Sequence, residues 1–107
     1  MKRGSILGYD LSEKNCQISY YDETKEEPVT LETAVENYQI PLILGYYNEH
    51  WVYGKEAKRL AEVQEENTIS DLYVRAVRRE KVEFAGKTRD AVWLLAKFIS
   101  LTLEDFE

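Results

Sequence analysis

The hydrophobic period of the sequence changes at Gly54, and this change limits the folds that the chain can adopt. Before Gly54, short runs rich in β-branched and aromatic residues alternate with polar turns, which is typical of strands joined by hairpins. After Gly54, apolar residues recur mainly at the spacing of amphipathic helices. Such an order predicts an α/β domain in which a partly antiparallel sheet, starting with hairpins, is covered by helices.

The first predicted hairpin joins residues 5–11 to residues 16–21. Both segments have strand composition, and the polar stretch from Ser12 to Asn15 between them suits a tight turn. Within the first strand, Gly8 and Asp10 interrupt an otherwise apolar run. A missing Cβ lets a ligand or another backbone approach, and a carboxylate at a strand end can hold a hydrated cation. The alternative is structural, with Gly8 in a bulge and Asp10 in a turn.

A second hairpin is predicted from residues 41–46 and 50–53, with Asn48 in the left-handed conformation in the turn between them. A brief strand is expected over residues 29–31, after a charged turn that ends at Pro28. Residues 33–39 show neither period and remain unassigned.

Two amphipathic helices are predicted after Gly54. The first covers residues 55–64. The second starts at Thr68, a residue type that caps helices well. Its apolar positions follow the helical template without interruption: Ile69, Leu72, Tyr73, Ala76 and Val77. Arginines occupy the other side of this segment, which usually indicates a solvated face.

The last predicted helix is apolar on nearly every side. A strand over residues 81–84 stops at Ala85 and Gly86, after which Thr88 opens a helix from residue 89 to about residue 103. Helices of this kind normally lie between two packed layers. We therefore expect either that the chain is a fragment of a longer protein or that this helix forms a homo-oligomer.

Composition narrows the class of protein. A chain of 107 residues forms one domain at most, so residues 1–107 are treated as a unit. The formal charge of -6 makes nucleic acid an unexpected partner, and no run of apolar residues is long enough for a membrane span. With one cysteine, Cys16, and one histidine, His50, zinc-type spacing is missing. Both residues are predicted to be structural, with His50 half-buried in a strand. A reducing, cytoplasmic location is expected.

Three stretches, taken in order, resemble the start of the nucleotide-binding lobe of the Hsp70 family, within the actin and sugar-kinase superfamily. The stretch ILGYDLSEKNCQISYYD resembles the opening hairpin of that family, whose pattern is G-x-D-x-G-T-T-N-[SC]. The stretch VYGKEAKRLAEVQEENTIS is similar to a second family string at Gly54, Ala57, Lys58, Asn67, Thr68 and Ile69. Finally, KVEFAGKTRDAVWLLAKFISLTLEDF resembles a strand, glycine turn and long helix of the family. The resemblance implies a ribonuclease H-like, actin-like fold.

The resemblance also implies a phosphate site that holds ATP and magnesium. In that family the first hairpin loop wraps the phosphates, and its aspartate orients water bound to magnesium, which assigns a catalytic and metal role to Asp10 and a phosphate-binding role to Gly8 and Asn15. Three more residues of the loop, Ser12, Glu13 and Lys14, stand where the family has Gly-Thr-Thr. A glutamate there repels phosphate, and Lys14 offsets part of the repulsion.

Two functions remain open from the sequence. When the family string is aligned without a gap through residues 67–69, the position of the family's catalytic lysine falls on Tyr73, which carries no positive charge. The first hypothesis is an Hsp70-like, chaperone-type ATPase in the parent protein, with this segment inactive alone. The second is a non-catalytic protein-interaction module on a degenerate actin-like fold. In both, the partner is the rest of the parent chain or another protein.

Overall fold

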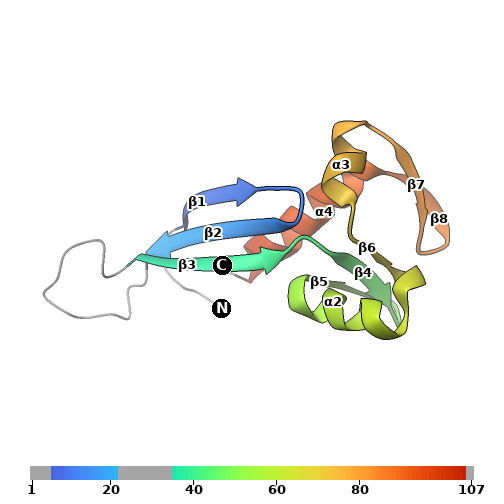
Figure 1. Ribbon diagram of the computed structural model, residues 1–107, viewed down its shortest axis with the longest axis horizontal. Coiled ribbons are helices and arrows are strands. Elements are labelled where there is room, and N and C mark those ends of the chain that lie inside the picture. Colours follow the sequence, from blue (N-terminus) through green and yellow to red (C-terminus); the bar gives the residue numbers. More distant parts are fainter. Residues whose placement is uncertain (1–5, 22–34, 106–107) are drawn as a thin grey trace, which may run out of the picture.

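Three strands at the start of the chain form one antiparallel sheet. The computed structural model describes residues 6–21 and 35–105. Strands β1 (Ile6–Leu11), β2 (Asn15–Tyr21) and β3 (Val35–Pro41) pair in the order β1-β2-β3 (Figure 1). The first predicted hairpin is thus confirmed. Strand β3 occupies most of the stretch that had no assignable period, whereas the strand predicted at residues 29–31 lies outside the described residues.

The second hairpin is confirmed with shifted bounds. Strand β4 (Leu44–Tyr47) starts later than predicted because Pro41 still belongs to β3, and it pairs with β5 (His50–Tyr53). Asn48 has φ 53° as predicted, and Glu49 follows with φ 65°. Two successive positive φ angles are typical of the tight hairpin turn that matches strand twist. Helix α2 (Gly54–Val63) and a short 3-10 turn, η1 (Glu65–Asn67), follow.

The predicted helix from Thr68 begins later than expected, which corrects that prediction. Thr68 and Ile69 form the short strand β6 (Thr68–Ile69) on the free side of β4, and the Thr68 hydroxyl donates to the Glu65 carbonyl instead of capping a helix. Helix α3 (Leu72–Val77) has Asp71 at its N-cap position. The apolar spacing fits both arrangements because Ile69 is buried by pairing with Leu44 as well as it would be by a helix.

The start of the last helix is likewise later than predicted. Strand β7 (Lys81–Phe84) is confirmed, but it turns at Ala85 and Gly86, both with positive φ, and pairs with β8 (Lys87–Asp90). Helix α4 (Ala91–Glu104) begins only after that strand. The expected start at Thr88 is wrong because Thr88 pairs with Glu83 in the hairpin.

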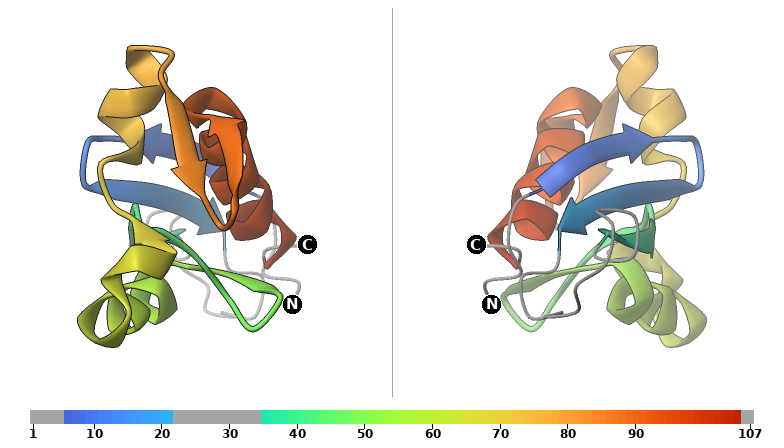
Figure 2. Two further views of the ribbon diagram at one scale, coloured as in Figure 1. Left: turned by 90° about the vertical axis from the view of Figure 1, so that its right-hand side faces the viewer. Right: turned by 90° about the vertical axis from the view of Figure 1, so that its left-hand side faces the viewer.

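Helix α4 packs beside the first sheet and closes the core (Figures 1 and 2). The register places Tyr9 opposite Ile18 and Leu11 opposite Cys16, so these four side chains share the face toward the core. On α4 the buried side chains are Ala91, Leu94, Phe98 and Thr102, while Val92 and Trp93 are about half exposed. The result is an α/β fold of small antiparallel sheets and helices. None of the helices in the described part of the chain is long and apolar enough to cross a membrane.

Candidate functional site

The turn from Ser12 to Asn15 is closed by its own hydrogen bonds. The Ser12 amide donates to the Asn15 carbonyl at 2.8 Å, and the Asn15 amide donates to Ser12 Oγ at 3.2 Å. The Ser12 hydroxyl in turn donates to the Asn15 carbonyl at 3.0 Å. Ser12 therefore holds the shape of the turn, and the side chains of Glu13 and Lys14 project from it, both exposed.

A cavity of about 390 Å³ lies against this turn. It brings together the turn, the β3–β4 connection, α2 and the segment before α3. Seven residues line it: Lys14, Asn15, Pro41, Leu42, Ile43, Lys58 and Ser70. The Leu42 amide donates to the Lys14 carbonyl at 2.9 Å, which fastens the turn to the wall of the cavity.

The charge of this cavity is opposite to that of the whole chain. Two lysines line it, and none of the lining residues that the structure describes carries a carboxylate, although the net charge of the chain is -6. Glu13, the expected source of repulsion, is not one of the lining residues. The amide of Asn15 and the hydroxyl of Ser70 add neutral hydrogen-bonding groups. This donor set suits an anion with several oxygens, such as a phosphate chain.

Lys58 and Ser70 are site residues that sequence reasoning missed. Lys58 lies on α2, which starts at the buried Gly54 with φ +65°, and Ser70 lies between β6 and α3. Lys58 was visible only as one match within the second family string, and nothing in the sequence indicated that it would lie near the hairpin turn. The β4–β6 pairing and the packing of α2 bring these distant segments together.

Gly8 and Asp10 lie on the face of the first sheet that is turned away from the core, opposite to Tyr9 and Leu11. Asp10 pairs with Gln17 and is exposed, and the register shifts between Ile6 and Gly8. The shift agrees with the bulge alternative for Gly8, but Asp10 is the second-last residue of β1, still paired with β2, and is not a turn residue. A Cβ added at Gly8 would meet only Ser19 Cβ, at 4.0 Å, so no close approach requires the glycine. Asp10 does not line the cavity of Lys14 and Lys58.

Arg75 is not a free cation near the site. Its guanidinium donates to Asp71 at 2.8 Å and lies 3.5 Å from Glu80, and Arg78 lies 3.8 Å from Glu80. Asp71 raises the pKa of Arg75 by this hydrogen bond. Two of the arginines on and just after α3, Arg75 and Arg78, are thus engaged in local ion pairs, as is common on a solvated helix face. Tyr73, the position of the family's lysine, is half-buried against the core.

Cys16 has the structural setting that the sequence predicted, whereas the prediction for His50 is only partly right. Cys16 is fully buried in β2, and burial raises the pKa of its thiol, which makes it a poor nucleophile. His50 lies in β5 as expected but is exposed, not half-buried. Within residues 6–21 and 35–105, no group of three or more His, Cys, Asp or Glu side chains could hold a metal ion.

Comparison with known protein families assigns the chain to one family. A search of curated proteins found no match. Residues 25–107 match a family described as "Family of unknown function (DUF5716) C-terminal". Because this match covers more than half of the sequence, the chain belongs to the DUF5716 family, and residues 25–107 correspond to the C-terminal region of that family.

Proposed function

We propose that this chain is part of an Hsp70-like, actin-like nucleotide-binding lobe with a ribonuclease H-like sheet, and that it contributes a site for the phosphates of ATP. The single observation that carries the proposal is the cavity at the first hairpin turn, lined by Lys14 and Lys58 without a carboxylate among its described lining residues. Antiparallel pairing of β1, β2 and β3 is compatible with the start of such a lobe.

The two lysines offset the altered loop chemistry. In the family pattern, backbone amides of glycine and threonine wrap the phosphates, whereas here the Ser12 amide is occupied within the turn. Ammonium groups on Lys14 and Lys58 would provide the positive charge in place of those amides and of the lysine that Tyr73 replaces. Phosphate binding would therefore rest on side chains more than on backbone groups.

Magnesium fits this proposal only together with phosphate. Bound to ATP, the ion would neutralise phosphate charge and take its ligands from phosphate and water. Asp10, the magnesium ligand that the resemblance implies, and Gly8 do not line the cavity of Lys14 and Lys58. The proposal therefore rests on the two lysines and assigns no protein ligand to the ion.

Binding without hydrolysis is the expected state of this segment by itself. No lysine stands at the position of Tyr73, and Arg75 is held by Asp71 and Glu80. ATP turnover in the parent protein would need groups from the rest of that protein, which is the partner we propose for this segment. A cytoplasmic location is part of the same proposal.

A second candidate function is a non-catalytic interaction module. It is favoured by the exposed Glu13 on the turn, which opposes phosphate, and by the exposed aromatic side chains Tyr47 and Trp93. Tyrosine and tryptophan are enriched where proteins bind each other. In this case the cavity lysines would have no nucleotide to bind.

Isothermal titration calorimetry with magnesium tripolyphosphate tests the first function directly. We expect the Lys14→Ala/Lys58→Ala double variant to bind at least about tenfold more weakly than the unmodified chain. The matched control is the Lys81→Ala/Lys87→Ala double variant, which removes the charges of two exposed lysines of the β7–β8 hairpin outside the cavity. Equal affinity in both variants would refute the cavity as a phosphate site.

ATP binding by the longer parent protein separates the two functions. Micromolar binding of ATP with magnesium supports the nucleotide-binding lobe, whereas no binding up to about 1 mM supports the interaction module. Magnesium-dependent ATP turnover by the 107-residue chain, abolished by Asp10→Asn, would contradict the expected lack of hydrolysis.

A further inference from the structure

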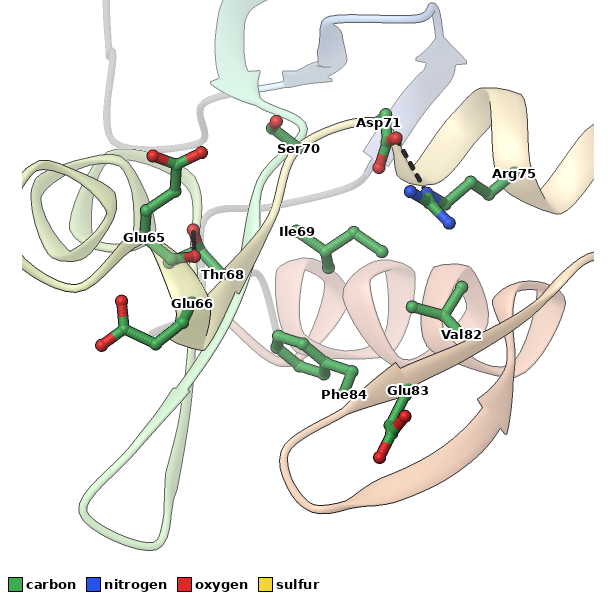
Figure 3. Close-up of a pocket in the computed structure, with 10 residues that line it drawn as sticks. All are labelled: Glu65, Glu66, Thr68, Ile69, Ser70, Asp71, Arg75, Val82, Glu83 and Phe84. Atoms are coloured by element: carbon green, nitrogen blue, oxygen red, sulfur yellow. Dashed lines mark hydrogen bonds and ion pairs between the residues drawn. The ribbon is translucent and has the colours of Figure 1, made fainter.

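A second and larger groove lies between β6 and β7 and shares Ser70 with the lysine-lined cavity. It has a volume of about 660 Å³. Figure 3 shows the apolar side chains of Ile69, Val82 and Phe84 between the two strands. These three side chains are largely buried and belong to the core, so the groove has a firm apolar floor.

The rim of this groove is acidic. Glu65 and Glu66 lie on the η1 side and Glu83 on the β7 side (Figure 3). All three are exposed, and none takes part in an ion pair within the described part of the chain. Asp71 and Arg75 also line the groove but bind each other at 2.8 Å. The groove therefore presents three uncompensated carboxylates around an apolar floor.

Two strand edges face this groove. Strand β6 is the last strand of the order β5-β4-β6, and β7 pairs only with β8 among the described strands. In Figure 3, the strand that carries Val82 and Glu83 forms the side of the β7–β8 hairpin nearer to Ile69, so the edge of β7 that is not paired with β8 is turned toward the groove. An unpaired strand edge offers backbone donors and acceptors to an added extended segment. Along β7, buried and exposed side chains alternate, which a partner strand would match.

We propose that the groove binds an extended segment of a partner protein in which lysine or arginine alternates with small apolar residues, and that this segment adds as a strand to β7. Charge complementarity selects the occupant: basic side chains would meet Glu65, Glu66 and Glu83. The apolar side chains would lie against Ile69, Val82 and Phe84. Backbone hydrogen bonds to β7 would supply affinity, and the acidic rim would select the sequence.

Fluorescence anisotropy with a labelled, end-capped hexapeptide of alternating Lys and Val tests this proposal on the whole chain. The peptide is expected to bind at least about tenfold more tightly than the same peptide with Glu in place of Lys. Methylation of alternate backbone nitrogens of the Lys–Val peptide should weaken binding by about tenfold as well, because it removes the donors that strand addition needs.

Charge-reversal variants locate the binding site. Glu83→Lys and, separately, Glu66→Lys should each weaken binding of the Lys–Val peptide by about fivefold or more. Glu104→Lys changes the net charge equally but lies on α4 outside the groove, so its affinity should stay within about twofold of the unmodified chain. Circular dichroism confirms that each variant is folded.

Three results would overturn this proposal. They are equal binding of the Lys and Glu peptides, equal weakening in Glu104→Lys and Glu83→Lys, and full binding by the N-methylated peptide. The first would exclude charge selection, the second would show attraction by net charge alone, and the third would exclude strand addition. None of these results bears on phosphate binding at Lys14 and Lys58.

Discussion

The hydroxyl of Tyr9 on β1 lies 2.7 Å from the hydroxyl of Thr102 on α4, and this contact joins residues 93 positions apart. Thr102 is fully buried and donates its own proton to the Ile99 carbonyl at 2.7 Å. Tyr9 is therefore the donor to Thr102. The pair fixes the last helix against the first strand and gives the buried Thr102 hydroxyl and the partly buried Tyr9 hydroxyl a partner.

Thr102→Val is expected to lower the free energy of unfolding by about 1–3 kcal/mol, because it keeps the shape of the side chain but leaves the Tyr9 hydroxyl without its acceptor. Tyr9→Phe should cost less, about 0.5–1.5 kcal/mol, because Thr102 still binds Ile99. Urea unfolding followed by circular dichroism measures both. Ser100→Ala, at an exposed position of α4, is the control; a loss there as large as in Thr102→Val would contradict this account.

Gly54→Ala should be more destabilising than Gly86→Ala, although both glycines have a left-handed φ. At Gly86 a Cβ would meet no atom within 4 Å, so only the backbone conformation is strained, by about 1–2 kcal/mol. At Gly54 the Cβ would lie 2.8 Å from Ile40 Cγ2, which adds about 1–3 kcal/mol of overpacking. Thermal and urea unfolding of the two variants measure which loses more stability. Equal losses would show that the Ile40 side chain moves aside at no cost in free energy.

Local signals were enough to predict both early hairpins and the left-handed Asn48. These signals failed where a helix and a strand would bury the same residues equally well. Ile69 at a helical position and Ile69 in β6 both remove the side chain from water, and only the pairing with Leu44 decides between them. Similarly, Thr88 has the residue type of a helix cap, yet the turn at Ala85 and Gly86 sends it back along β7. Both decisions depend on contacts outside the local window.

The candidate site was predictable only in part for the same reason. The turn from Ser12 to Asn15 could be predicted from the local sequence, because strand patterns flank a polar tetrapeptide. Its charge partner Lys58 lies 44 positions after Lys14 and reaches the cavity through the packing of α2. The groove between β6 and β7 could not be predicted because neither β6 nor β8 was expected. A strand edge becomes visible only when the sheet order is known.

Arg89→Ala is expected to lower the free energy of unfolding by about 1–3 kcal/mol. The Arg89 guanidinium lies 5.4 Å from the ring centroid of Trp51 and 5.5 Å from that of Trp93, and it donates to the Phe84 carbonyl at 2.7 Å. Its removal thus loses two cation–π contacts, from β8 to β5 and to α4, and a charged hydrogen bond from β8 to β7.

Lys87→Ala on the same strand is the control for Arg89→Ala. Lys87 is exposed, and its replacement by alanine removes the same charge. A change within about 0.5 kcal/mol is expected there. Tryptophan fluorescence should shift in Arg89→Ala but not in Lys87→Ala. An unchanged stability and spectrum in Arg89→Ala would mean that the two rings do not depend on the guanidinium between them.

The stability of the fold should decrease in alkaline solution, and Tyr9 should cause a measurable part of the decrease. Burial, helped by the neighbouring Cys16 thiol, raises the pKa of Tyr9 far above its ordinary value. A tyrosine in the unfolded chain ionises near pH 10 while folded Tyr9 keeps its proton, so the native state binds more protons. This contribution is complete below about pH 10 and is lost progressively as the pH rises toward the folded pKa.

Urea unfolding of the unmodified chain and of Tyr9→Phe at pH 8 and pH 11 isolates this effect. The stability advantage of the unmodified chain over Tyr9→Phe should shrink by about 1 kcal/mol between the two pH values. Burial also raises the pKa of Cys16, so its share of the loss begins lower, above about pH 8.5. Because the Tyr9 hydroxyl interacts with this thiol, both proteins also carry Cys16→Ala, which removes that share. A pH-independent difference between the two proteins would show that the Tyr9 hydroxyl ionises as readily in the fold as in water, against its burial beneath α4.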